Sequence, residues 1–229
     1  SAPTATVKAD AIESGNGGNI AIWSNKYTRF YGLLSAQGGR LSGNGGFAEV
    51  SGRDGLDFNG FVSTTAANGQ MGTLLLDPRN LTIVEAGGTL ANLTDADEFT
   101  DTPAVDSSID VAVINAAGSN VVLDANRDLT FNNTVTAINL AGGKSLTANS
   151  GRILTVSAGS NISAEGGIAL NAASHIEMSG GLTASNNAIS LNAGQPVGPS
   201  GGGTGHINLN AGSSINSNGG AVTLLAPNA

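Results

Sequence analysis

Apolar and polar residues alternate along short runs of this chain, and glycine-containing pairs separate one run from the next. The run at 19–23 has counterparts at 47–51 and 73–77. Alternate side chains of a β-strand point to the same face. The alternation therefore predicts three strands with a shared inward face, formed by Ile20, Ile22, Ala48, Val50, Leu74 and Leu76.

The runs also repeat at regular intervals. Gly-Asn-Gly-Gly at 15–18 returns 28 residues later at 43–46, and the same offset relates Phe30 to Phe58. Such self-similarity is typical of solenoids, in which each repeat buries its apolar face against the next. The glycine-containing corners are too close together for helical crossovers between strands. We therefore expect an all-β fold, a parallel β-helix that forms a single domain over 1–229.

The repeat changes along the chain. Residues 1–86 hold long-period turns and residues 121–229 hold shorter ones. Between them, 87–120 is interpreted as an acidic and helical insertion, with a capping box at 107–110 and a helix near 108–117. A loop rich in glycine and proline is expected at 194–205. Further strands are expected at 120–123, 128–131, 137–140, 145–148 and 153–156.

Two shorter sequence repeats occur in the C-terminal half. Isoleucine followed four residues later by two glycines begins at Ile162, Ile176 and Ile215. Three runs of the form Ile-x-Leu-Asn-Ala place an asparagine at the same point, and stacked amides can form a hydrogen-bonded ladder. The ladder predicted from these runs consists of Asn171, Asn192 and Asn210.

Composition narrows the possible partners. Hydrophobic residues make up 40% of the chain but aromatic residues only 4%, so the core must be aliphatic. The net charge of −8 argues against nucleic acid, whose binding needs clustered Lys and Arg. The chain has no Cys, which excludes disulfides and thiol chemistry. It also lacks an apolar run of about 18 residues, so we expect no membrane-spanning segment.

Candidate catalytic groups are few. His175 and His206 begin short strands, and only Glu177 is a carboxylate near either. A polysaccharide-active β-helix would need carboxylates and arginines on one face, for which the candidates are Glu49, Asp54, Asp57, Asp77, Arg53 and Arg79. A calcium loop is suggested by the acids of 95–101, but its glycine and final glutamate are missing. An aromatic sugar platform could come from Trp23, Tyr27, Phe30 and Tyr31. We assign no catalytic, cofactor or metal residues and expect no enzyme.

Several segments together carry a family resemblance. They read Gly-Asn-Ile-Ala-Ile-Trp-Ser at 18–24, Thr-Arg-Phe-Tyr-Gly at 28–32, Gly-Asn-Gly-Gly-Phe-Ala-Glu-Val-Ser-Gly at 43–52, Asn-Gly at 68–69, Gly-Thr-Leu-Leu-Leu-Asp-Pro at 72–78, Asn-Val-Val-Leu at 120–123 and Ala-Asn-Arg-Asp-Leu-Thr at 125–130. This stretch resembles filamentous-haemagglutinin-like exoproteins of Gram-negative bacteria. The resemblance implies a right-handed parallel β-helix exported by two-partner secretion. Members are adhesins, haemophore-like binders or stalks for contact-dependent toxins.

The expected function follows from fold and resemblance together. The family's secretion domain is absent from the sequence, so we expect an interior or processed portion, located outside the cell or at the bacterial surface. We expect a structural segment of an adhesin-like fibre, without cofactors. One alternative is a subunit that stacks end to end into a matrix filament, because 221–225 is apolar and has no charged cap. Another is a β-helix that binds or cleaves polysaccharide. The expected partners are further copies or adjoining β-helix segments at the open ends. Surface glycans or proteins of a host or neighbouring cell are alternative partners.

Overall fold

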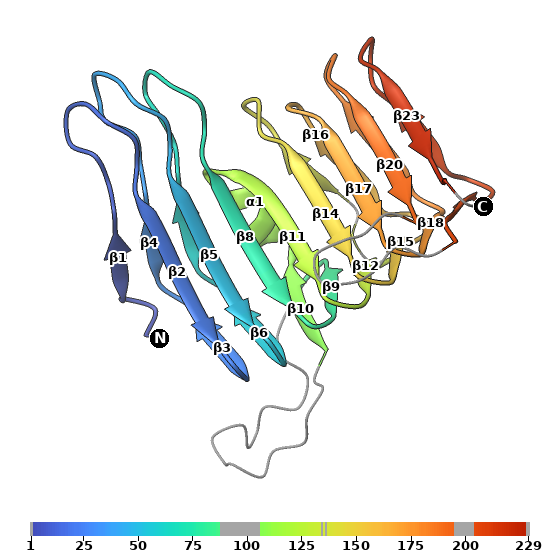
Figure 1. Ribbon diagram of the computed structural model, residues 1–229, viewed down its shortest axis with the longest axis horizontal. Coiled ribbons are helices and arrows are strands. Elements are labelled where there is room, and N and C mark those ends of the chain that lie inside the picture. Colours follow the sequence, from blue (N-terminus) through green and yellow to red (C-terminus); the bar gives the residue numbers. More distant parts are fainter. Residues whose placement is uncertain (1, 88–105, 134, 136, 195–203, 228–229) are drawn as a thin grey trace.

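The computed structural model describes residues 2–87, 106–133, 135, 137–194 and 204–227, and these form a parallel β-helix. Every strand pair among them is parallel, and each turn of the chain lies on the turn before it. Figure 1 shows the turns side by side from the N-terminal to the C-terminal end. The all-β fold expected from the sequence is confirmed.

The first wall of the solenoid is a sheet of eight strands, here called the long sheet. At the usual separation of neighbouring strands it spans roughly 35 Å. Its register is continuous, since Ile22 pairs with Val50 and Val50 with Leu76. In spatial order the strands are β2 (Asn19–Ser24), β5 (Phe47–Gly52), β8 (Thr73–Pro78), β11 (Asn120–Ala125), β14 (Leu146–Ser150), β17 (Ile168–Ala172), β20 (Ile189–Ala193) and β23 (Val222–Leu225).

One strand of the second wall is out of sequence order. Ser107 to Asp110 pair with the strand that begins at Leu81, and Ser107 Oγ accepts a hydrogen bond from Leu56 N at 2.8 Å on the other side. The strand therefore lies between neighbours that both precede it in the chain. The order in this wall is β3 (Tyr27–Phe30), β6 (Gly55–Phe58), β10 (Ser107–Asp110), β9 (Leu81–Val84), β12 (Leu129–Phe131), β15 (Ile153–Val156), β18 (His175–Met178) and β21 (His206–Leu209).

A short helix takes the place of a strand in the third wall. Thr64 N donates to Gly118 O just after the helix, and Asn115 Oδ1 accepts from Asn139 N at 2.7 Å on the opposite side. The helix is therefore held between two strands of this wall. The order is β1 (Thr6–Lys8), β4 (Leu33–Ser35), β7 (Phe61–Ser63), α1 (Val111–Ala116), β13 (Ile138–Leu140), β16 (Asn161–Ala164), β19 (Gly181–Ala184) and β22 (Ser214–Asn216).

The helix expected near 108–117 exists, but its predicted start is wrong. Residues 107–110 form β10, and the N-cap is Asp110, whose side chain accepts a hydrogen bond from Ala112 N at 2.8 Å. The predicted capping box began at Ser107, which is instead fully buried against Leu56. Pairing with β9 therefore prevails over the local helix signal at these four residues.

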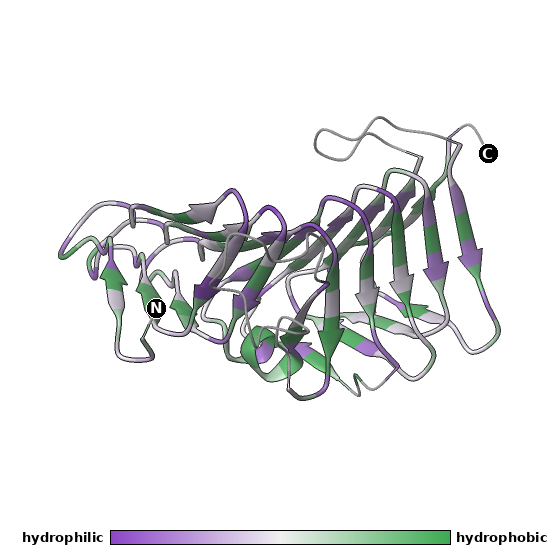
Figure 2. Ribbon diagram, turned by 90° about the horizontal axis from the view of Figure 1, so that it is seen from below, coloured by the Kyte–Doolittle hydropathy of each residue, from purple (hydrophilic) through white to green (hydrophobic). Residues whose placement is uncertain are grey.

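The core consists of aliphatic side chains in rows along the axis, and Figure 2 shows hydrophobic and hydrophilic residues alternating along the strands. In the long sheet, all but one of the inward positions expected from the sequence are buried; Ile22 is partly buried and packs on the core. The three runs in which isoleucine precedes a glycine pair do not all stack on one another. Ile176 belongs to the second wall, whereas Ile162 and Ile215 lie in the third with Leu182 between them.

Candidate functional site

The outward face of the long sheet carries a row of amides along the axis. Asn171 Nδ2 donates to Asn149 Oδ1 at 2.9 Å, and Asn192 Nδ2 donates to Asn171 Oδ1 at 2.8 Å. These three residues, here called the amide ladder, pair in register on β14, β17 and β20. The predicted ladder is correct for two members. Asn210 lies beyond β21 in the second wall, where its Nδ2 donates to Ser179 Oγ.

Two half-buried carboxyl groups continue the same row. Asp77 and Asp124 are the next residues after the paired Leu76 and Leu123 on β8 and β11, so they lie side by side. Burial raises the pKa of Asp77 to about 7, with further contributions from the charges of Asp124 and Glu49. Burial also raises the pKa of Asp124, and a hydrogen bond from Asn149 opposes that rise. Of these two groups, called the carboxyl pair below, Asp77 therefore takes up a proton close to neutral pH.

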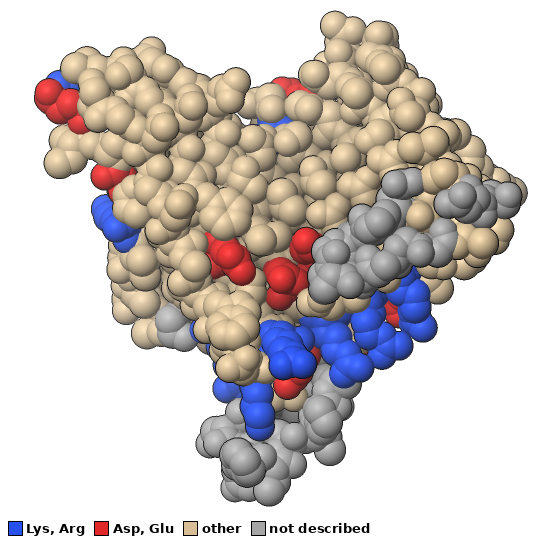
Figure 3. All heavy atoms as spheres, in the orientation of Figure 1, with Lys and Arg blue, Asp and Glu red and all other residues tan. Residues whose placement is uncertain are grey.

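Basic side chains gather at the corner where the long sheet turns into the second wall. Arg53 follows β5, Arg79 follows β8 and Arg127 follows β11. The backbones of the last two are joined by a hydrogen bond from Arg127 N to Arg79 O at 2.9 Å. We call these three residues the arginine corner. Figure 3 shows Lys and Arg gathered along this edge, with acidic side chains on the face above it.

A cavity of about 420 Å³ opens at the arginine corner, and Asp54 and Asn126 complete its lining. Asn126 also connects the corner with the carboxyl pair, because its Nδ2 donates to Asp77 Oδ1 at 3.4 Å. The cavity thus combines guanidinium donors, an amide and a carboxylate. A fourth arginine, Arg152, continues the corner and pairs with Asp128, whose pKa is lowered chiefly by that hydrogen bond.

The structure assembles the predicted carboxylate group only in part. Glu49 and Asp77 share the outer face, and Asp54 lies in the corner cavity. Asp57 is buried in β6, where it accepts a hydrogen bond from Tyr31 Oη at 2.5 Å. Burial, together with this bond, raises the pKa of Tyr31 to about 12. Asp57 therefore does not belong to the outer group.

Sequence reasoning missed two residues of this site. Asp124 and Arg127 stack on the turn that holds Asp77 and Arg79, but the segment at 87–120 separates the two turns in the sequence. The signal that could have found them is the run Val121 to Asp124, which repeats the pattern of 74–77.

The aromatic residues do not form a common platform. Phe30 is buried and stacks on Phe58, with ring centroids 6.2 Å apart. Tyr31 is partly buried and bonded to Asp57, while Trp23 is 59% exposed on the long sheet. The predicted sugar-binding cluster is therefore divided between the core and two surfaces.

The two histidines pair with each other. His175 and His206 are in register on β18 and β21, and their ring centroids lie 4.8 Å apart. His175 Nδ1 also contacts the hydroxyl of Ser174, and Glu177 accepts a hydrogen bond from Asn208 Nδ2 at 2.6 Å. No group of three or more His, Cys, Asp or Glu within the described ranges is arranged to hold a metal ion. The acids of 95–101 lie outside those ranges.

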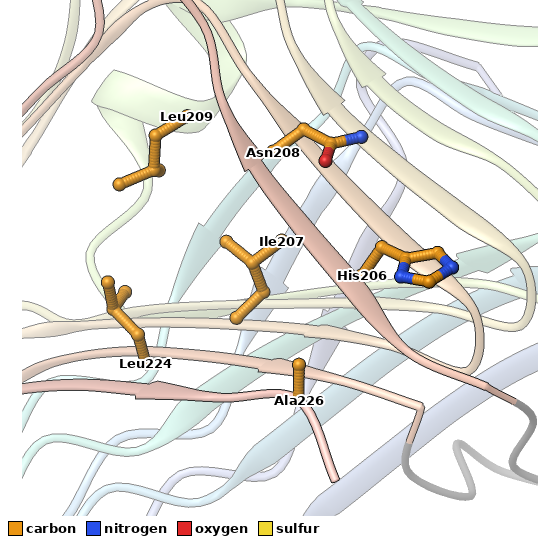
Figure 4. A pocket seen from close by; sticks show the side chains of 6 residues that line it. All are labelled: His206, Ile207, Asn208, Leu209, Leu224 and Ala226. Carbon is orange, nitrogen blue, oxygen red and sulfur yellow. The ribbon is translucent and has the colours of Figure 1, made fainter. Parts of the chain in front are cut away.

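Apolar side chains of the core are exposed at the last described turn. Val222 and Leu224 on β23 are 47% and 46% exposed although they continue buried rows, and Leu209 on β21 is 48% exposed. In Figure 4, Ile207, Leu224 and Ala226 line a cavity of about 320 Å³ while the polar ends of His206 and Asn208 point away. An apolar surface and an unpaired strand edge thus meet at this end.

No protein-family model matches the chain, and a search of curated proteins returns no match either. The single helix of the described ranges is too short to cross a membrane.

Proposed function

We propose that this chain is a structural segment of a secreted, surface-associated bacterial fibre of the adhesin type. The observation that carries the proposal is the continuous register of the long sheet across eight parallel strands. Each turn adds backbone hydrogen bonds and a layer of aliphatic core, and the turns of β14, β17 and β20 each add one amide of the outer ladder. Such a body is stiff along its axis and presents corners and outer faces to a partner.

Two further points support a structural role. The likeness of 18–78 and 120–130 to filamentous-haemagglutinin-like exoproteins associates this fold with bacterial surface fibres. In addition, the polar groups of the outer face are largely engaged with one another. Asp124 and the amide ladder bond along the row, and Asp77 accepts from Asn126. These contacts strengthen the sheet and leave few groups oriented for catalysis.

Immunogold electron microscopy of intact source cells tests the proposal. Antibodies raised against the folded chain should label thread-like material outside the outer membrane of unpermeabilised cells. Pre-immune serum should give no label. Label that appears only after the cells are permeabilised would contradict the proposed location and therefore the fibre role.

The exposed apolar end favours a second candidate, a subunit that stacks end to end into a matrix filament. A contact between the two different ends of identical molecules is heterologous and forms open filaments. Unpaired strand edges are ready templates for such pairing. The exposed Val222 and Leu224 would then be covered by the N-terminal turn of the next molecule.

Sedimentation and negative-stain microscopy of the isolated chain decide between the two candidates. A filament subunit should polymerise alone, and Leu224→Glu should prevent this by placing a charge in the contact. Phe61→Glu is the matched control because Phe61 is 48% exposed on β7, which lies between β4 and α1 and away from both ends. Monomers at all concentrations, or equal effects of both variants, would reject end-to-end stacking.

A further inference from the structure

We propose that the arginine corner binds a linear polysaccharide whose sugars carry carboxylates, a polyuronate, lying along the axis of the solenoid. The inference deepens the proposed function by naming a ligand class for one displayed surface. It rests on that function only for its cellular setting, because binding by the purified chain is measured independently of any fibre.

The first argument is the spacing of the cations. Arg53, Arg79 and Arg127 follow the carboxyl ends of three consecutive strands of the long sheet. Neighbouring strands are about 4.8 Å apart, so each turn adds one guanidinium group to the row. A ligand with negative charges repeated along its length would meet one cation on every turn. A single small anion would use only part of the row.

The second argument is that these guanidinium groups make no close ion pair in the described part of the chain. Arg53, Arg79 and Arg127 make no ion pair there, whereas Arg152 on the next turn is held by Asp128. Like charges on neighbouring strands repel one another. Asp54 lines the same cavity and the charge of Arg127 acts on Asp128, yet the row still holds more positive than negative groups, on a chain whose net charge is −8. An anionic ligand would relieve this repulsion.

The third argument concerns the other groups in the cavity. Asn126 and Asp54 lie among the arginines and offer hydrogen-bond donors and acceptors to hydroxyl groups. The planar guanidinium fork matches a carboxylate in a two-bond geometry. A chain of uronate sugars supplies both kinds of group, carboxylates for the arginines and hydroxyls for the amide and carboxylate.

Nucleic acid fits this surface less well. Duplex DNA carries one charge per about 1.7 Å of its axis, and its binding usually involves many phosphate contacts. The corner offers three arginines with Asp54 among them, and the acidic Glu49 lies on the adjoining outer face. Dense phosphate would be repelled by that face, whereas a more widely spaced polyuronate could follow the corner alone.

Isothermal titration calorimetry with the intact chain tests the proposal. Polygalacturonate is the probe, and neutral dextran, dextran sulfate and duplex DNA are the comparison ligands. We expect binding to polygalacturonate and none to dextran. The double variant Arg79→Gln/Arg127→Gln should bind at least about tenfold more weakly, which corresponds to the loss of about 1.4 kcal/mol. Arg127→Lys should lose part of the affinity because it keeps the charge but not the planar fork.

Arg40→Gln is the control for a general effect of positive charge, since it removes one such charge from a residue that pairs with Glu13 away from the corner. Its affinity for polygalacturonate should equal that of the unchanged chain, and circular dichroism should show that all variants are folded. Three results would each overturn the proposal: no binding of polygalacturonate, an equal loss in Arg40→Gln, or equal or tighter binding of dextran sulfate or DNA. Immunogold labelling of the cell surface would stand in any of these cases.

Discussion

At the scale of single residues, the environment of a side chain decides its chemistry more than its type does. Asp77 and Asp128 are both aspartates at the same end of neighbouring turns. The first is half-buried beside Asp124, and its pKa is raised to about 7. The second accepts hydrogen bonds from Arg152, and its pKa is lowered. Only the first therefore changes its charge near neutral pH.

This difference gives a pH-dependent prediction. The pKa of Asp77 rises from 3.8 to about 7 on folding, so folding takes up a proton between these values. The free energy of unfolding accordingly decreases as pH rises through that window. Asp77→Asn removes the charge and should raise the melting temperature by roughly 3 °C at pH 8. At pH 4, where the folded carboxyl is already neutral, it should change little.

Thermal unfolding followed by circular dichroism at both pH values measures this effect. Asp54→Asn is the control, because it removes the same charge from a corner residue that lies beside Arg53 and Arg79. The control should show no rise in melting temperature at pH 8. An equal change at pH 4 and pH 8 in Asp77→Asn would show that ionisation of the pair does not strain the fold.

Single residues of the site were only partly predictable from sequence. Glu49 and Asp77 could be assigned to one face because strict alternation fixes it over a short strand. Asp124 could not, since its neighbour in space depends on the register across the intervening segment. Asn210 was misplaced for a related reason. Its local pattern repeats that of Asn192, but the next strand of the long sheet is β23.

At the scale of the elements, glycine sets how closely successive turns approach. A Cβ on Gly45 would lie 1.7 Å from Thr64 O and 2.5 Å from Gly72 N. Both atoms belong to backbone, which cannot move aside without breaking its own hydrogen bonds. The recurrent glycines of 15–18 and 43–46 thus reflect a steric requirement of the corner as well as a turn preference.

Gly45→Ala should consequently be severely destabilising, by more than about 4 kcal/mol, or prevent folding. Gly118→Ala is the matched control, because its Cβ would meet Thr65 Cγ2 at an ordinary 3.4 Å. We expect the control to change the free energy of unfolding by less than about 1 kcal/mol. Urea denaturation of both variants is the measurement. Similar stabilities would show that the turns can separate at this corner without cost.

Most strands could be read from sequence, and the exceptions have a common cause. The predicted strand at 153–156 matches the structure to the residue, and two of the Ile-x-Leu-Asn-Ala runs, at 168–172 and 189–193, coincide with β17 and β20. Alternation identifies such strands because one face of each is buried. β10 was taken for the start of a helix, since nothing local distinguishes a capping box from a strand that pairs across the chain.

At the scale of the whole molecule, the sequence repeats were sufficient to predict the fold. A period that returns the same residues to the same face leaves parallel stacking as the simplest packing, and the registers of β2, β5 and β8 confirm it. The position of α1 in the third wall was not predictable, because it depends on contacts with β7 and β13. The helix within the predicted insertion therefore occupies one layer of the third wall.

The out-of-order position of β10 has a consequence for how the chain acquires its structure. A nascent or translocating chain that emerges from its N-terminus presents β9 before β10, yet β10 occupies the layer between β6 and β9. The second wall cannot close turn by turn, because β6 lacks its neighbour until residues 107–110 have emerged. We therefore expect the second wall to be completed at this layer only after Ser107 has reached Leu56.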